Sequence, residues 1–90
     1  MQFETFYHIK MPMPLEKALL RTKKIKSNGL IMECPTKDFS PESYQFFYMD
    51  LVDFLNDTVG KEFATKYLHK CKIYQVVKEN GEIIDRKQVA

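Results

Sequence analysis

The segment that most constrains the fold lies in the middle of the chain, at residues 40–60. Ser40, Pro41 and Glu42 supply a capping hydroxyl, a proline suited to a first helical turn and an acid that favours the positive end of the helix dipole. The apolar side chains that follow recur with helical spacing: Tyr44, Phe47, Tyr48, Leu51, Leu55 and Val59. This pattern predicts a long helix with one face in the core.

Gly60 is predicted to end or kink this helix. Each helical residue turns by about 100°, and at that step the apolar stripe after Gly60 is rotated well away from the earlier one. The second stripe consists of Phe63, Ala64, Tyr67, Leu68 and Cys71. One straight helix would have to bury two different faces, so two helices or one kinked helix fit the sequence better.

Residues 2–11 alternate with a period of two and are rich in aromatic residues, which predicts a strand. One face of the strand consists of Phe3, Thr5, Tyr7, Ile9 and Met11. The other face is more polar, and we expect His8 to be a partly exposed surface residue there. Pro12 and Pro14 end the strand, and Pro14 can begin a short helix at residues 15–21.

Two Asn-Gly pairs predict tight hairpin turns, because this dipeptide readily adopts the two positive φ angles of a type I′ turn. Asn28-Gly29 joins predicted strands at residues 22–27 and 30–34, and Pro35 is expected to close the second of them. Asn80-Gly81 joins predicted strands at residues 72–78 and 82–89.

These elements predict an α+β fold with an antiparallel sheet and one long helix that is continuous or kinked at Gly60. The order is strand, helix, hairpin, helix and strand, which matches a ferredoxin-like sandwich with an extra C-terminal strand. Ninety residues suit one domain, and a hydrophobic content of 44% indicates a folded core. We therefore expect residues 1–90 to form a single α+β domain.

Several classes of protein are not expected. No apolar run approaches the roughly 20 residues that cross a bilayer, so we expect no membrane partner. Residues 1–10 lack the basic start and long apolar run of a signal peptide. Two cysteines are too few for a disulfide scaffold. The expected location is the cytoplasm.

The chain lacks the sequence motifs of the common catalytic sites. It has no G-x-S-x-G, P-loop, G-x-G-x-x-G, CxxC or HExxH pattern. Cys34 with His8 or His69 could form a thiolate pair, but we expect Cys34 and Cys71 to be structural, as buried cysteines commonly are. We therefore assign no catalytic residues and no cofactor, although an unfamiliar active site stays open.

Asp50, Asp53 and Asp57 share one face of the predicted helix, because they are spaced by three and four residues. Carboxylates that converge in this way can hold Mg²⁺ or Ca²⁺. One helix face seldom closes a cation cage, and no EF-hand pattern surrounds these residues. We therefore predict a solvated acidic stripe and no metal site.

The same helix face suggests a binding surface. Large apolar side chains stand among the acids there, as in an aromatic anchor with a polar rim. The predicted partner-binding residues are Phe46, Met49, Asp50, Asp53, Phe54 and Asp57. The sequence favours a non-enzymatic protein that binds another protein in an accessory, regulatory or inhibitory role, of the kind found in phages or mobile elements. A homodimer through this helix is one form that such binding could take. The structural alternative is that another layer of the fold buries Phe46 and Phe54.

Charge suggests a second function. The net charge is only +2, but residues 10–26 carry +5, residues 33–57 carry −5 and residues 58–78 carry +4. The first block could bind nucleic acid through Lys17, Arg21, Lys23, Lys24 and Lys26. An open sheet would let Phe3, Tyr7 or Tyr74 stack on bases. No RNP1 pattern is present, and lysine outnumbers arginine, so nucleic-acid binding remains the alternative prediction.

Overall fold

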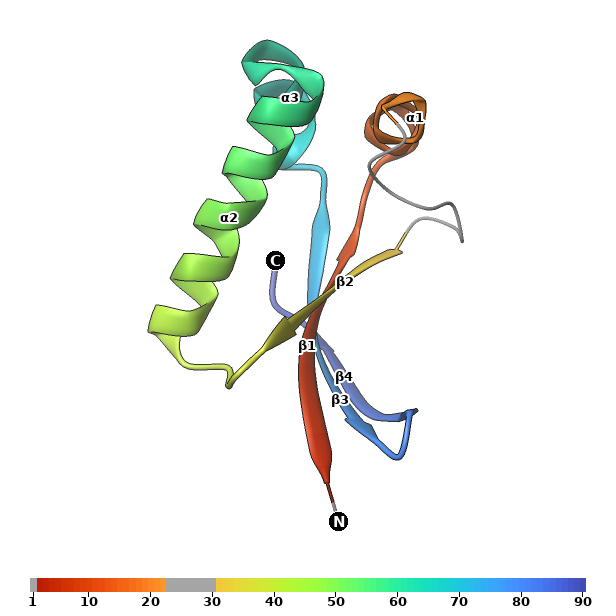
Figure 1. Ribbon diagram of the computed structural model, residues 1–90, viewed down its shortest axis with the longest axis vertical. Helices are drawn as coiled ribbons and strands as arrows, with labels where there is room; N and C mark the ends of the chain where they lie inside the picture. Colours follow the sequence, from red (N-terminus) through yellow and green to blue (C-terminus); the bar gives the residue numbers. More distant parts are fainter. Residues whose placement is uncertain (1, 23–30) are drawn as a thin grey trace.

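The strands form one antiparallel sheet with helices packed on it (Figure 1). The computed structural model describes residues 2–22 and 31–90, and within these ranges the sheet has the order β2-β1-β3-β4. The elements are β1 (Phe3–Lys10), α1 (Met13–Arg21), β2 (Ile31–Thr36), α2 (Pro41–Val59), α3 (Lys61–Leu68), β3 (Lys72–Glu79) and β4 (Glu82–Gln88). The α+β fold predicted from the sequence is confirmed.

The described ladders agree with the predicted ferredoxin-like order: β1 lies between β2 and β3 and pairs antiparallel with both, and β4 joins β3 as the extra C-terminal strand. In a split βαβ unit the two parallel strands are not neighbours, because another strand lies between them, so antiparallel ladders are expected throughout such a sheet. The strand predicted at residues 22–27 lies outside the described residues apart from Thr22, which ends α1.

Helix α2 begins and ends where the sequence predicts. Ser40 Oγ accepts a hydrogen bond from the Ser43 backbone N–H at 3.1 Å, and Pro41 occupies the first turn. Gly60, with φ of +88°, ends α2 and precedes α3. A left-handed φ is open to glycine at little cost, so the predicted break at Gly60 is confirmed as two separate helices.

The core lies between the helices and one face of the sheet, as the alternation of β1 predicts. Tyr7 and Ile9 are fully buried and face Leu51 and Leu55 of α2. The remaining buried members of this cluster are Met11, Leu15, Leu19, Ala64, Cys71 and Ile73. All three helices of the described ranges contribute to it. None of these helices combines the length and the apolar character that crossing a bilayer requires.

The opposite face of the sheet corrects the prediction for His8. His8 is only 6% exposed, and its Nε2 lies 2.7 Å from Glu33 Oε2. Basic side chains also cover aromatic rings on this face: Lys78 Nζ lies 4.8 Å from the Phe6 ring centre, and the Arg86 guanidinium lies 3.9 Å from that of Tyr74. The sheet shields this face with its own long side chains, so a histidine on the polar face is buried after all.

The two predicted hairpins have different outcomes. Most of the Asn28-Gly29 hairpin lies outside the described residues, and Thr22, predicted to start its first strand, instead ends α1 in a helical conformation. Pro35 does not close β2, which continues to Thr36, because a proline is tolerated where its position needs no ladder N–H. Asn80 and Gly81 form the predicted turn between β3 and β4, with φ of +54° and +82°.

Strand β4 carries a feature that the sequence did not predict. Val77 pairs with Asp85 whereas Lys78 pairs with Ile83, so the register shifts and Ile84 has no ladder partner. The hairpin turn projects beyond the helices, as the blue strands of Figure 1 show. Ile83 and Ile84 are consequently about half exposed, at 50% and 52%.

Candidate functional site

The outer face of α2 carries most of the predicted partner-binding residues. Phe46 is 69% exposed and Met49 is 53% exposed, and Asp50, Asp53 and Asp57 are exposed beside them. No described layer covers Phe46. The side chains that α2 directs into the core lie on its other face, so the helix holds two separate apolar surfaces, one buried and one open to solvent.

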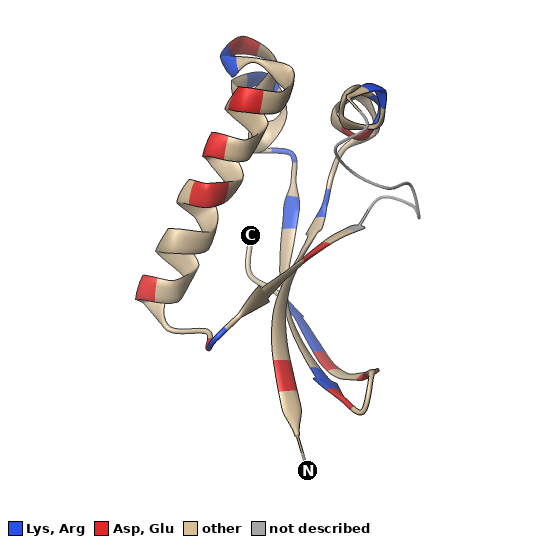
Figure 2. Cartoon of the chain, in the orientation of Figure 1, with Lys and Arg blue, Asp and Glu red and all other residues tan. Residues whose placement is uncertain are grey.

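Charge on α2 has one sign. The helix contains Glu42, Asp50, Asp53 and Asp57 and no Lys, Arg or His, and Figure 2 shows the acids along its length. In the described part of the chain, no basic side chain lies within 4.0 Å of these carboxylates; the ion pairs found there involve Glu33. The negative charge of α2 is therefore available to a partner.

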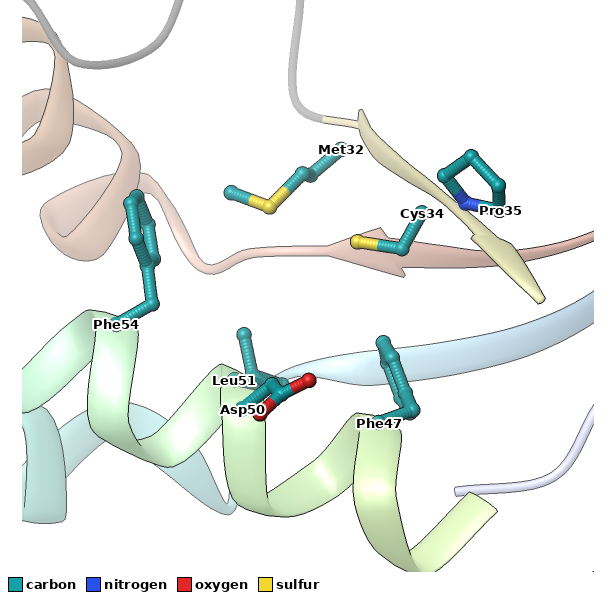
Figure 3. Close-up of a pocket in the computed structure, with 7 residues that line it drawn as sticks. All are labelled: Met32, Cys34, Pro35, Phe47, Asp50, Leu51 and Phe54. Atoms are coloured by element: carbon teal, nitrogen blue, oxygen red, sulfur yellow. The ribbon is translucent and has the colours of Figure 1, made fainter. Parts of the chain in front are cut away.

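Phe54 differs from the other predicted residues, because it is half-buried and packs against the core. It lines an apolar groove of about 280 Å³ between α2 and β2 (Figure 3). Phe47 and Leu51 of α2 and Met32, Cys34 and Pro35 of β2 complete the walls, and Asp50 adds an exposed carboxylate. The sequence analysis missed the β2 residues, since only the packing of the helix beside this strand brings them to the site.

Cys34 and His8 do not form the thiolate pair considered from the sequence. Cys34 lies opposite Tyr7 on the helix side of the sheet, whereas His8 contacts Glu33 on the other side. Burial raises the pKa of the Cys34 thiol, and the nearby charges of Glu33 and Asp50 raise it further. Burial alone raises the pKa of Cys71 to about 11. Both shifts favour the neutral thiol over the nucleophilic thiolate.

The aspartates of α2 stand in a row along the helix and do not converge on one point. Among the described residues, no three His, Cys, Asp or Glu side chains gather closely enough to hold a metal ion. Asp50, Asp53 and Asp57 thus present a charged surface rather than a coordination shell.

The residues of the nucleic-acid alternative are only partly placed. Lys17 and Arg21 are exposed on α1, beside a hollow that Phe63 of α3 also lines. Lys23, Lys24 and Lys26 lie outside the described residues.

The predicted stacking residues are differently placed. Tyr7 is fully buried under the helices, so the expectation that it could stack on bases is wrong. Tyr74 is already covered by the Arg86 guanidinium. Phe3 is 56% exposed.

Comparison with known proteins finds no relative of this chain. The chain matches no protein-family model, no curated protein and no solved structure. The α2 face and the adjoining groove are therefore interpreted from their own exposure, charge and shape.

Proposed function

We propose that this chain binds another protein, one with a basic surface, through the outer face of α2. The observation that carries the proposal is the exposure of Phe46 and Met49, 69% and 53%, among acids that no described basic residue pairs. The proposal includes an accessory or regulatory role, in which binding changes the activity of the partner.

Physical reasoning supports a protein partner. Large aromatic side chains, together with Met, are enriched in the centres of protein interfaces, and charged residues form their rims. Phe46 makes no contribution to the core cluster, so the fold does not explain its presence. Burial of an exposed phenylalanine of this kind against a partner contributes on the order of 2 kcal/mol.

The same charges argue against a symmetric dimer through this face. A two-fold axis places the same surface of each copy against the other. Asp50, Asp53 and Asp57 of one copy would then approach those of the second copy, and like charges in an interface are unfavourable. A basic partner neutralises the acids instead, so we favour a different protein over a second copy.

Affinity capture from a lysate of the native host, treated with nuclease, tests the proposal. The tagged wild type is compared with Phe46→Ala and Asp53→Lys, which should each lose a specific protein band while keeping the wild-type circular dichroism spectrum. Phe3→Ala and Glu82→Lys are the matched controls, because they change an exposed phenylalanine and an exposed acid far from α2. These controls should keep the band.

Two outcomes would refute the proposal. One is a set of captured proteins that is the same for wild type, Phe46→Ala and Asp53→Lys. The other is material that disappears with nuclease and binds less after Lys17→Glu or Arg21→Glu, with an affinity that falls steeply with salt. That second result would establish the nucleic-acid alternative.

A further inference from the structure

We propose that the groove between α2 and β2 receives one apolar side chain of a basic amphipathic helix in the partner. This inference rests on the proposed function and names the class of partner element. The groove adjoins the outer face of α2, because Asp50 lines the groove and is also one of the exposed acids of that face. A partner that covers Phe46 therefore reaches the groove with the same element.

The size of the groove suits a single side chain. Its volume is about 280 Å³, slightly below the range of roughly 300–1,000 Å³ that is typical of pockets for small molecules. Figure 3 shows the side chains of Met32 and Cys34 facing those of Phe47 and Phe54 across it. These walls are apolar, and an aliphatic or aromatic side chain is the group that gains most from entering them.

The aspartates of α2 indicate where the partner helix carries its basic residues. Asp50, Asp53 and Asp57 follow one line along α2, and the first and the last are about 10 Å apart along the helix axis. Lysines or arginines three and four residues apart on a second helix have the same repeat. A helix laid along α2 can therefore place its basic residues opposite these acids while an apolar residue enters the groove.

A helix fits this surface better than an added strand. An added strand binds through the backbone N–H and C=O groups of a sheet edge. Pro35 lies within β2 and has no N–H to donate. The exposed acids and one wall of the groove come from the side chains of α2, and an amphipathic helix recognises such a surface with residues spaced by three and four.

A peptide titration followed by amide NMR shifts tests the inference. The probe is a capped, Ala-based helical peptide of about 17 residues, with one central Leu and with Lys three and four positions to either side. Its matched controls replace the Leu by Ala or every Lys by Glu. On the protein side, Asp53→Asn removes one of the three aspartate charges that the partner helix is proposed to pair, and Glu42→Gln removes an exposed acid of the same helix that does not line the groove.

We expect the Leu peptide to shift the amides of Met32, Cys34 and Phe54 and to slow alkylation of the Cys34 thiol. Replacing its Leu by Ala should weaken binding about tenfold, and the Glu peptide should not bind. Asp53→Asn should weaken binding about threefold, and Glu42→Gln should leave it unchanged.

Equal binding of the Leu and Ala peptides, or shifts confined to Phe46 and Met49, would show that the groove takes no side chain. The absence of any shift on α2 would rule out a helical partner of this kind. Either result overturns this inference and leaves the proposed function standing, provided that capture still depends on Phe46 and Asp53. Loss of that dependence would refute the proposed function itself.

Discussion

Glu33 and Lys78 form an ion pair across the central strand of the sheet. Lys78 Nζ donates to Glu33 Oε2 at 2.6 Å, although β1 separates their strands. The same oxygen lies 2.7 Å from His8 Nε2, and the Lys78 ammonium stands over the Phe6 ring. This pair therefore links three strands on the face that no described helix covers. The hydrogen bond from Lys78 is the main cause that holds the pKa of Glu33 below its ordinary value.

Glu33→Gln is expected to destabilise the fold by about 1 kcal/mol, a modest value because the Glu33 side chain is 38% exposed to solvent. A lowered folded pKa means that the contribution is complete above the ordinary value of 4.5 and is lost as pH falls through the folded pKa. Urea denaturation at pH 7 and at pH 3 measures both effects. Glu82→Gln, an exposed acid on β4, is the control; an equal loss in both variants would contradict the assignment.

Tyr7→Phe is expected to raise stability by about 1 kcal/mol. Tyr7 is fully buried, stacked on Phe47 with ring centres 4.3 Å apart. Its hydroxyl has no hydrogen-bond partner among the described residues, and burial is the main cause that raises its pKa. The phenylalanine keeps the stacking and removes the buried polar atom. Thermal unfolding measures the effect, with Tyr48→Phe, which changes a half-buried ring of α2, as the control variant. A lower melting temperature for Tyr7→Phe than for the wild type would disprove the prediction.

Gly60→Ala is expected to cost about 1 kcal/mol. An added Cβ would meet no atom within 4 Å, so crowding is not the reason. The reason is the φ of +88°, which L side chains rarely adopt. Chemical denaturation should show this loss, whereas Lys61→Ala at the start of α3 should be nearly neutral. If Gly60→Ala has the same free energy of unfolding as the wild type, the prediction is wrong, because the junction of α2 and α3 then accepts the alanine without penalty.

The start of α2 is expected to depend on pH. Hydrogen bonds from the Ser43 hydroxyl and the Ser40 backbone N–H lower the pKa of Asp38 to about 2. The ordering that Asp38 provides is thus complete above pH 3.8 and is lost as pH falls through about 2.

NMR titration of the Ser40 amide, which donates to Asp38 Oδ1, follows this loss directly, and a midpoint near 3.8 would contradict it. Ser40→Ala, which removes the cap itself, should cost about 1 kcal/mol. Thr65→Ala, an exposed hydroxyl within α3, is its control.

Sequence reasoning succeeded where a signal is local. The capping serine, the break at Gly60 and the Asn80-Gly81 turn each depend on a few neighbouring residues, and the structure has all three. It failed where two distant segments decide the outcome. Pro35 was expected to close a strand, but its place beside β1 tolerates the missing N–H. His8 was expected on an exposed polar face, but Glu33 and Lys78 from other strands enclose it.

The candidate site divides in the same way. The sequence by itself determined the acidic, aromatic face of α2, because helical periodicity alone places Phe46 and the aspartates together. Only the tertiary structure decided that Phe46 stays exposed while Phe54 turns toward β2 and helps to form a groove. Exposure and grooves depend on which elements pack side by side, and residues as far apart in the chain as Met32 and Phe54 meet only after the sheet and the helix have packed together.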